Sequence, residues 1–308
     1  MFKDPADERQ RVWNYGFTLT DSNVHEERLN VRARISQTSR EMLYRNGQVV
    51  ELPGIPRQHH AVLRAASGAQ QLLVSLGAVL KIPVLKDVCT WFSTCTSITD
   101  FEVPHMNRFP IRMLPAGFAD NMDVQQDVVH FLSAFGSTIT GFDVVGRLLR
   151  RPGMVSLPCT PSTGQRRAAS SGCRLGGGTL KTLALYPHLQ HVLNAGGLLL
   201  IDGLNASLHP LLVHGVIQIF LDPARNSLHA QLLFTSHDSW ILNAEILRRN
   251  EIWTAEKHDG ASSLYSLAEF KLENKENVRK DAGYMKNYLL GRYGGIPDMR
   301  PLKIREDG

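Results

Sequence analysis

Two short apolar segments in the second half of the chain place the strongest constraint on its fold. Residues 198–202 (LLLID) and 231–235 (QLLFT) have the length and composition of strands that are buried on both faces. Apolar residues recur at helical spacing over 179–193, 208–221 and 239–248, so helices and buried strands alternate along this region. That order predicts an α/β domain built on a parallel sheet.

Residues 1–55 follow a different pattern, in which short strand-like segments are separated by polar turns. Strands are expected at residues 12–19, 25–33, 40–44 and 49–52. The pair Asn46-Gly47 lies between the last two segments, and Asn-Gly in that position is a strong hairpin signal. This part of the chain is therefore predicted to be an antiparallel β subdomain.

Residues 56–150 are predicted to form a helical insert. Helical spacing of apolar residues runs up to Pro83, which is expected to end that stretch, and it returns over 84–92 and 124–135. A short strand is expected at 139–145. The change from a strand-like to a helical period is what separates this insert from the segment before it.

Residues 151–175 are rich in Pro, Ser, Thr, Arg and Gly and show little periodicity, so they are predicted to be a loop. Residues 176–308 are expected to form the C-terminal subdomain that contains the parallel sheet. Within it, segments 252–255 and 263–267 are expected to pair at the sheet edge across a turn at Asp259-Gly260.

The chain has 308 residues, of which 43% are hydrophobic and 20% charged, as in an ordinary globular protein. No segment reaches the roughly 18 to 20 apolar residues that cross a bilayer, and the charged N-terminus lacks the apolar core of a signal peptide. We therefore expect a cytoplasmic protein with no membrane partner. The net charge of +5 permits contact with nucleic acid without requiring it, and the four cysteines show no CxxC spacing.

Polar side chains follow both buried strands. Asp202 ends the first strand segment, and His237 comes two residues after the second. Because the carboxyl ends of parallel strands meet at one edge of a sheet, where ligands collect, the two side chains are expected to lie close together. Each has an ordinary structural alternative, since many strands end in Asp and a single His is often a core residue. Between the strands, Ser207 and Pro210 fit the N-cap and first turn of a helix.

A glycine run, Gly176-Gly177-Gly178, precedes Thr179 and the helix that begins there. Three glycines allow the backbone to approach an anion closely, and the N-terminus of a helix supplies oriented N–H groups. A flexible turn is the alternative explanation of the same residues.

Taken together and in this order, these segments resemble AAA-domain ATP-binding proteins of ABC architecture, the group that includes abortive-infection and related bacterial defence ATPases. The resemblance is carried by GGGTLKTLALYPHLQHVLNAGGLLLIDGLNASLHPLL, HAQLLFTSHDSWILN, LRRNEIWTAEK, SSLYSLAEFK and NYLLGRYGGIP. It covers residues 176–297, and the first half of the chain matches more loosely. It implies a P-loop NTPase-like ABC ATPase fold that uses ATP and Mg²⁺.

The resemblance also implies roles for individual residues. Asp202 looks like the Walker B aspartate that holds Mg²⁺, and His237 looks like the switch histidine that senses the γ-phosphate, so both are expected to be catalytic. The residues expected to contact nucleotide through the signature loop are Gly176, Gly177, Gly178 and Thr179. Ser207, with Asn205 and Ala206, falls in the D-loop, which crosses the interface of family dimers, and Ser207 is also expected to contact the nucleotide.

Two features depart from the family pattern. The sequence contains no GxxxxGK[ST] phosphate-binding loop, because two residues separate Gly178 from Lys181-Thr182. The chain thus resembles a family member that lacks its first strand, P-loop and first helix, and its sheet is expected to expose an unpaired edge or an uncovered apolar face. Gly203 also stands where the family has the glutamate that polarises the attacking water.

These observations lead to one expected function with two alternatives. The chain is expected to be a truncated or degenerate protein of an ATP-hydrolysing family that is inactive alone. It is alternatively a non-catalytic subunit that completes the ATP site of a partner, or a nucleic-acid-binding defence component. The expected partner is a second copy in a head-to-tail homodimer or a P-loop-bearing relative.

Overall fold

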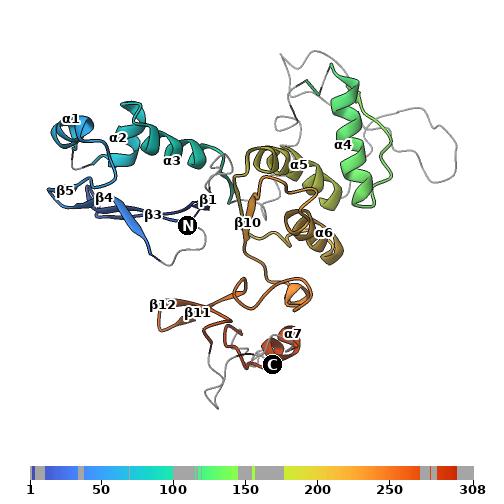
Figure 1. Ribbon diagram of the computed structural model, residues 1–308. Coiled ribbons are helices and arrows are strands. Elements are labelled where there is room, and N and C mark those ends of the chain that lie inside the picture. Colours follow the sequence, from blue (N-terminus) through green and yellow to red (C-terminus); the bar gives the residue numbers. More distant parts are fainter. Residues whose placement is uncertain are drawn as a thin grey trace, which may run out of the picture.

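The computed structural model describes residues 2–3, 11–33, 38–68, 70–99, 115, 117–118, 120–144, 155–156, 177–270, 278 and 283–296. Within these residues the fold is mixed α/β. Figure 1 shows an N-terminal sheet covered by helices at one end, the strand β10 near the centre, and helix α4 at the other end. No helix in the described ranges is both long and apolar enough to span a membrane.

The N-terminal sheet is the predicted antiparallel meander, with an additional strand at Phe2–Lys3 that was not expected. Its five strands lie in sequence order and are β1 (Phe2–Lys3), β2 (Val12–Leu19), β3 (Val24–Arg32), β4 (Arg40–Asn46) and β5 (Val49–Glu51). The Asn-Gly turn joins β4 and β5, where Asn46 pairs with Val49. The local hairpin signal was therefore sufficient to predict both the strands and their connection.

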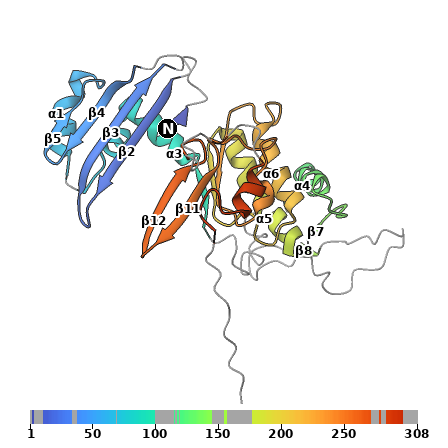
Figure 2. The same cartoon turned by 90° about the horizontal axis from the view of Figure 1, so that it is seen from below.

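Helices cover one face of this meander. They are the 3-10 turn η1 (Arg57–His59), α1 (His60–Ala66), α2 (Leu73–Val79) and α3 (Pro83–Ser93). Figures 1 and 2 show α1 and α3 on the same side of the sheet, and Leu29, Leu43 and Leu85 are fully buried in the core between them. Pro83 was expected to end a helix, but it occupies the first turn of α3, where its missing N–H costs nothing.

A buried carboxylate fixes α2 to the meander. Glu27 of β3 is fully buried, and its two carboxylate oxygens accept the N–H groups of Leu73 and Val74 at 2.7 and 2.9 Å. The Tyr15 hydroxyl donates to the same carboxylate at 2.9 Å. Burial, followed by the Glu27 charge, raises the pKa of Tyr15, so its phenol remains a donor. The orphan N–H groups of a helix start thus satisfy a charge that would otherwise be buried unpaired.

A three-stranded parallel sheet has the order β10-β9-β6 and joins two strands from the second half of the chain to one from the first half. Its strands are β6 (Thr96–Ile98), β9 (Leu198–Ile201) and β10 (Gln231–Phe234). The two predicted strands are adjacent and parallel, with Leu198 opposite Gln231 and Ile201 opposite Phe234. β6 was not predicted, because it is three residues long and lies inside the segment expected to be helical.

Two long helices pack on one face of the parallel sheet. They are α5 (Gly177–Ala195) and α6 (Pro210–Leu221), and Leu189 and Val216 join Leu199 and Ile201 in one buried cluster. Helix α4 (Met122–Ala134) packs in turn on α5 (Figure 1). Both α5 and α6 correspond to predicted helices.

The strand predicted after α4 is shorter than expected. The strand expected at 139–145 is limited to β7 (Asp143–Val144), which pairs with β8 (Val155–Ser156). Ile139 and Phe142 are instead buried against α4 and α5 without forming a strand. Apart from β8, the loop predicted at 151–175 lies outside the described residues.

The helix expected at 239–248 is only the 3-10 turn η4 (Ser239–Ile241). The N–H of Met285, in helix α7 (Tyr284–Leu289), donates to the carbonyl of Leu242 at 3.0 Å. A carbonyl that would be an intrahelical acceptor therefore binds another segment. Apolar residues of this segment, such as Ile246, are buried although they are not in a helix. Their helical spacing therefore led to the wrong prediction.

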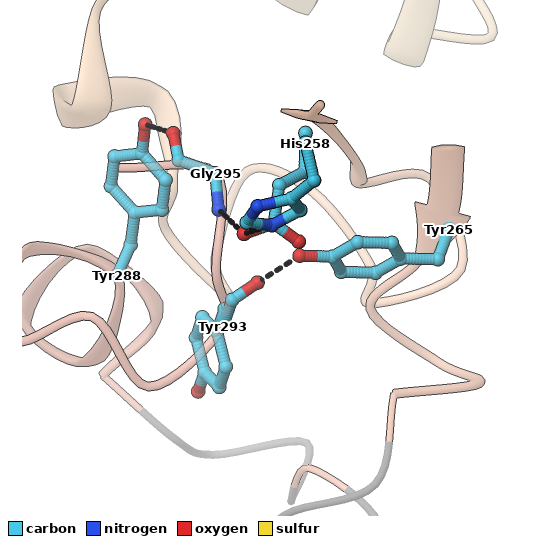
Figure 3. A network of polar contacts seen from close by, with 6 residues as sticks. His258, Tyr265, Tyr288, Tyr293 and Gly295 are labelled. Carbon is cyan, nitrogen blue, oxygen red and sulfur yellow. Dashed lines mark hydrogen bonds and ion pairs between the residues drawn. The ribbon is translucent and has the colours of Figure 1, made fainter. Parts of the chain in front are cut away.

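A hairpin formed by β11 (Trp253–His258) and β12 (Ala261–Ser266) turns at Asp259-Gly260, as predicted. It is a separate two-stranded sheet, so its expected place at the edge of the parallel sheet was wrong. The segment after α7 is attached to this hairpin, because the Tyr265 hydroxyl donates to the carbonyl of Tyr293 at 2.6 Å (Figure 3). Figure 3 also shows the Tyr288 hydroxyl donating to the carbonyl of Gly295.

Candidate functional site

The candidate site lies where β9 and β10 end. Asp202 follows β9 directly, and Thr235 follows β10 directly, so the parallel register places the two residues side by side. The Thr235 hydroxyl donates to Oδ1 of Asp202 and accepts the N–H of Gly203 at 2.8 Å. Backbone bonds join the same two ends, from Thr235 N–H to Ile201 and from Leu204 N–H to Thr235, both at 3.0 Å. The two strand ends therefore form one hydrogen-bonded unit.

His237 belongs to the same unit. Its N–H donates to Oδ1 of Asn205 at 3.2 Å, so the loop that follows Asp202 holds the backbone of the histidine. The side chains of Asp202 and His237 are both exposed. The structure thus brings these two residues to the same edge of the sheet, at the ends of neighbouring parallel strands.

The loop after Asp202 is a tight series of turns from residue 202 to 207. Gly203 is buried and has a φ of 71°, and Ser207 has a φ of 58°. Left-handed backbone favours glycine, because a Cβ atom crowds the following carbonyl. Gly203, at the position where the resemblance implies a glutamate, therefore has a backbone conformation that suits glycine.

Ser207 does not cap α6. His209 is the N-cap, since its Nδ1 accepts the N–H of Leu211 at 3.2 Å, and Pro210 occupies the first turn as expected. Ser207 is exposed, and its backbone contributes instead to the contact with α5 described next.

Two residues of the glycine run, Gly177 and Gly178, form the first turn of α5 together with Thr179. A Cβ atom on Gly178 would lie 3.1 Å from the carbonyl oxygen of Ser207. This close approach brings the start of α5 against the loop that follows Asp202. Gly176 lies outside the described residues.

The side chains at this edge of the sheet are of types that can bind Mg²⁺ and phosphate. Asp202 offers one exposed carboxylate, and His237 offers one exposed imidazole that can donate to a phosphate oxygen. In the described ranges no three His, Cys, Asp or Glu side chains gather into a group that could hold a metal ion by themselves. Mg²⁺ typically keeps one or two protein carboxylates and completes its shell with phosphates and water, so a single Asp fits that ion only together with ATP.

Thr235 is the site residue that the sequence did not identify. It lies in the second predicted strand, two positions before His237. The sequence could have identified Thr235 if the two predicted strands had been aligned by their polar ends, because that alignment places Thr235 opposite Asp202. Without the register, a Thr at a strand end is an ordinary β-forming residue.

A parallel sheet covered by helices, with an aspartate and a histidine at adjacent strand ends, is consistent with an AAA-type, ATPase-like domain. Residues 174–243 match the family model described as "AAA domain, putative AbiEii toxin, Type IV TA system". The match runs from the glycine run to just beyond His237, so it contains every residue of the candidate site. No curated protein matches the chain.

Proposed function

We propose that this chain supplies the Walker B and switch part of an ABC-type ATP site whose P-loop comes from outside the 308 residues. The supporting observation is that Asp202 and His237 lie on neighbouring strand ends joined by the side chains of Thr235 and Asn205. Two side-chain hydrogen bonds thus hold both residues at one edge of the sheet. The P-loop source is a preceding segment of a longer chain or a second polypeptide.

In the completed site, ATP and Mg²⁺ supply the transferable phosphate and the charge that neutralises it. Asp202 would hold the cation through its carboxylate. His237, at the next strand end, would donate a hydrogen bond to the terminal phosphate. Both contributions are electrostatic, which is how proteins mainly promote phosphoryl transfer.

Hydrolysis is expected to be slow even in the completed site. Gly203 has no side chain that accepts a proton or orients water, and its N–H is already bound by Thr235. Loss of a positioned general base costs roughly 10²- to 10⁴-fold in rate. We therefore propose that the site binds ATP but hydrolyses it slowly, so that ATP binding and not hydrolysis is its main activity.

The outer edge of β10 could pair with the strand that would precede an added P-loop. The N–H groups of Gln231 and Thr235 bind β9, so in a parallel ladder the alternate residues Leu232 and Phe234 direct their backbone groups to the other side. β10 ends the three-stranded sheet in the described part of the chain, and Leu233 beside that edge is 57% exposed. Parallel sheets are normally covered on both faces, so this edge and face fit an added strand with its helix.

The proposal is tested with a chimera. The strand, P-loop and first helix of a P-loop-bearing protein that matches the same family model are joined ahead of Met1, and MgATP binding is measured by calorimetry. The chimera is expected to bind MgATP with micromolar affinity, and the same chimera with its P-loop lysine changed to Ala is expected to lose binding. Micromolar affinity in the 308-residue chain alone, or no binding by the chimera, would contradict the proposal.

A second candidate function is completion of a partner's ATP site in trans. The contact between Gly178 and Ser207 favours it, because it places the signature-like helix start beside the D-loop-like turn. Family dimers use both elements across their interface. Mixing the chain with an intact P-loop-bearing relative should change the relative's ATPase rate, and an unchanged rate at saturating chain would exclude this role.

A further inference from the structure

Thr235 makes a directed bridge between the two strand ends. A hydroxyl has one proton, and the Thr235 hydroxyl accepts the N–H of Gly203 while it donates to Asp202. The N–H of Gly203 therefore turns the hydroxyl so that its proton points to the carboxylate. This arrangement occupies Oδ1 of Asp202 and fixes the rotation of the carboxylate group.

An exposed aspartate without such a partner would sample several rotamers, and each would present its oxygens differently. With Oδ1 held by Thr235, the carboxylate of Asp202 would be presented to a cation in one fixed rotation. Metal sites generally contain residues that hydrogen-bond to the metal ligands and fix their orientation. Loss of such a residue weakens metal binding even though it does not contact the ion.

We propose that Thr235 is a positioning residue for Mg²⁺ binding by Asp202. This inference rests on the proposed function, because a single carboxylate binds Mg²⁺ tightly only when ATP completes the shell. It assigns to Thr235 a role beyond linking β9 to β10, which the backbone hydrogen bonds between the strands already do.

The test uses the P-loop chimera with Mn²⁺ as the probe, whose free concentration is measured by electron paramagnetic resonance in the presence of ATP. Thr235→Val keeps the shape of the side chain and removes the hydroxyl, and Thr235→Ser is the matched control that keeps it. Thr235→Val is expected to weaken Mn²⁺ binding about tenfold, whereas Thr235→Ser stays close to the parent. ATP affinity in the absence of metal is expected to be the same in all three.

A double-mutant cycle separates positioning from a general structural effect. If Thr235 acts through Asp202, Thr235→Val has no further effect on Mn²⁺ binding once Asp202→Asn is present. An equal loss in both backgrounds, or no loss in the single variant, would overturn the inference. If Thr235→Val does not fold, as judged by circular dichroism, Thr235→Ala is measured against the same expectations.

The outcomes also distinguish this inference from the proposed function. A parent chimera that fails to bind MgATP would refute the proposed function itself. A parent chimera that binds MgATP, together with a Thr235→Val variant that binds Mn²⁺ equally well, would refute only the role of Thr235.

Discussion

Gly178 at the start of α5 lies against the carbonyl of Ser207, in the loop that follows Asp202. The contact joins two segments that are separated in sequence by the whole of α5 and β9. A Cβ atom here would lie 3.1 Å from a backbone oxygen, so the loop or the helix would have to shift by a few tenths of an ångström to accept any other residue. The glycine run therefore does more than allow a flexible turn.

The variant Gly178→Ala tests this contact. Replacing a helical glycine with alanine normally stabilises a protein by roughly 0.5–1 kcal/mol, and we expect that gain to be absent or reversed here. Urea denaturation of the 308-residue chain measures the change. Gly16→Ala is the control, because a Cβ atom there meets nothing within 4 Å. Equal stabilisation by both variants would show that α5 and the loop are not in contact.

The sequence predicted those parts of the fold that are specified locally. The meander followed from short strand-like segments and an Asn-Gly turn, and the strands that end at Ile201 and Phe234 followed from continuous apolar residues. In each case a few neighbouring residues determine the element, so reading the chain segment by segment is enough.

The parts that were not predicted depend on distant contacts. The three residues of β6 form a strand only because β9 provides a partner, and residues 242–248 leave the helical pattern because α7 binds the carbonyl of Leu242. The same holds in the candidate site. Asp202 and His237 stood out by residue type, whereas Thr235 acquires its importance only from the register of β9 and β10.

Glu27→Gln is expected to destabilise the N-terminal subdomain. The buried carboxylate accepts two backbone N–H groups and the Tyr15 hydroxyl, and an amide would present its NH₂ group to one of these donors. Hydrogen bonds to charged groups contribute roughly 1.5–3 kcal/mol, so we expect a loss of about 2 kcal/mol in the free energy of unfolding. Glu26→Gln, at the less buried neighbouring position, should change stability by less than about 0.5 kcal/mol. Similar losses in both variants would contradict the capping role of Glu27.

Tyr265→Phe is expected to loosen the segment after α7. The variant removes the hydroxyl that donates to the carbonyl of Tyr293 and retains the aromatic ring, which stacks with Phe270. Loss of one such bond costs about 1 kcal/mol, which should appear as faster amide hydrogen exchange in residues 283–296. Tyr44→Phe is a suitable control on the N-terminal meander. Unchanged exchange in residues 283–296 would show that other contacts hold the segment.

His188 of α5 is expected to make stability depend on pH. Burial, followed by repulsion from His191, lowers the pKa of His188, and its Nε2 has no hydrogen-bond partner among the residues that the structure describes. The unfolded chain then takes up a proton before the folded chain does. Stability is therefore complete above the unfolded pKa of about 6.5 and is lost as the pH falls through the lower folded pKa.

Thermal unfolding of His188→Leu between pH 7.5 and pH 5 checks this expectation. The variant should lose less stability on acidification than the parent, because it has no proton to gain at this position. The exposed His130, changed to Gln, is the control and should follow the parent curve. A His188→Leu curve that falls as steeply as the parent's would assign the pH dependence to other groups.

Gly203→Glu restores the residue type that the family resemblance expects, yet we expect it to leave the P-loop chimera without efficient hydrolysis. Gly203 has a φ of 71°, and a side chain in left-handed backbone costs roughly 1–2 kcal/mol. The N–H of this residue is also bound by the Thr235 hydroxyl, which limits how far the backbone can adjust to a new side chain. Gly203→Ala carries the same backbone cost without the carboxylate and is the matched control. Equal ATPase rates and equal losses in the free energy of unfolding are expected for the two variants, whereas a clearly faster Gly203→Glu chimera would show that the missing carboxylate alone limits turnover.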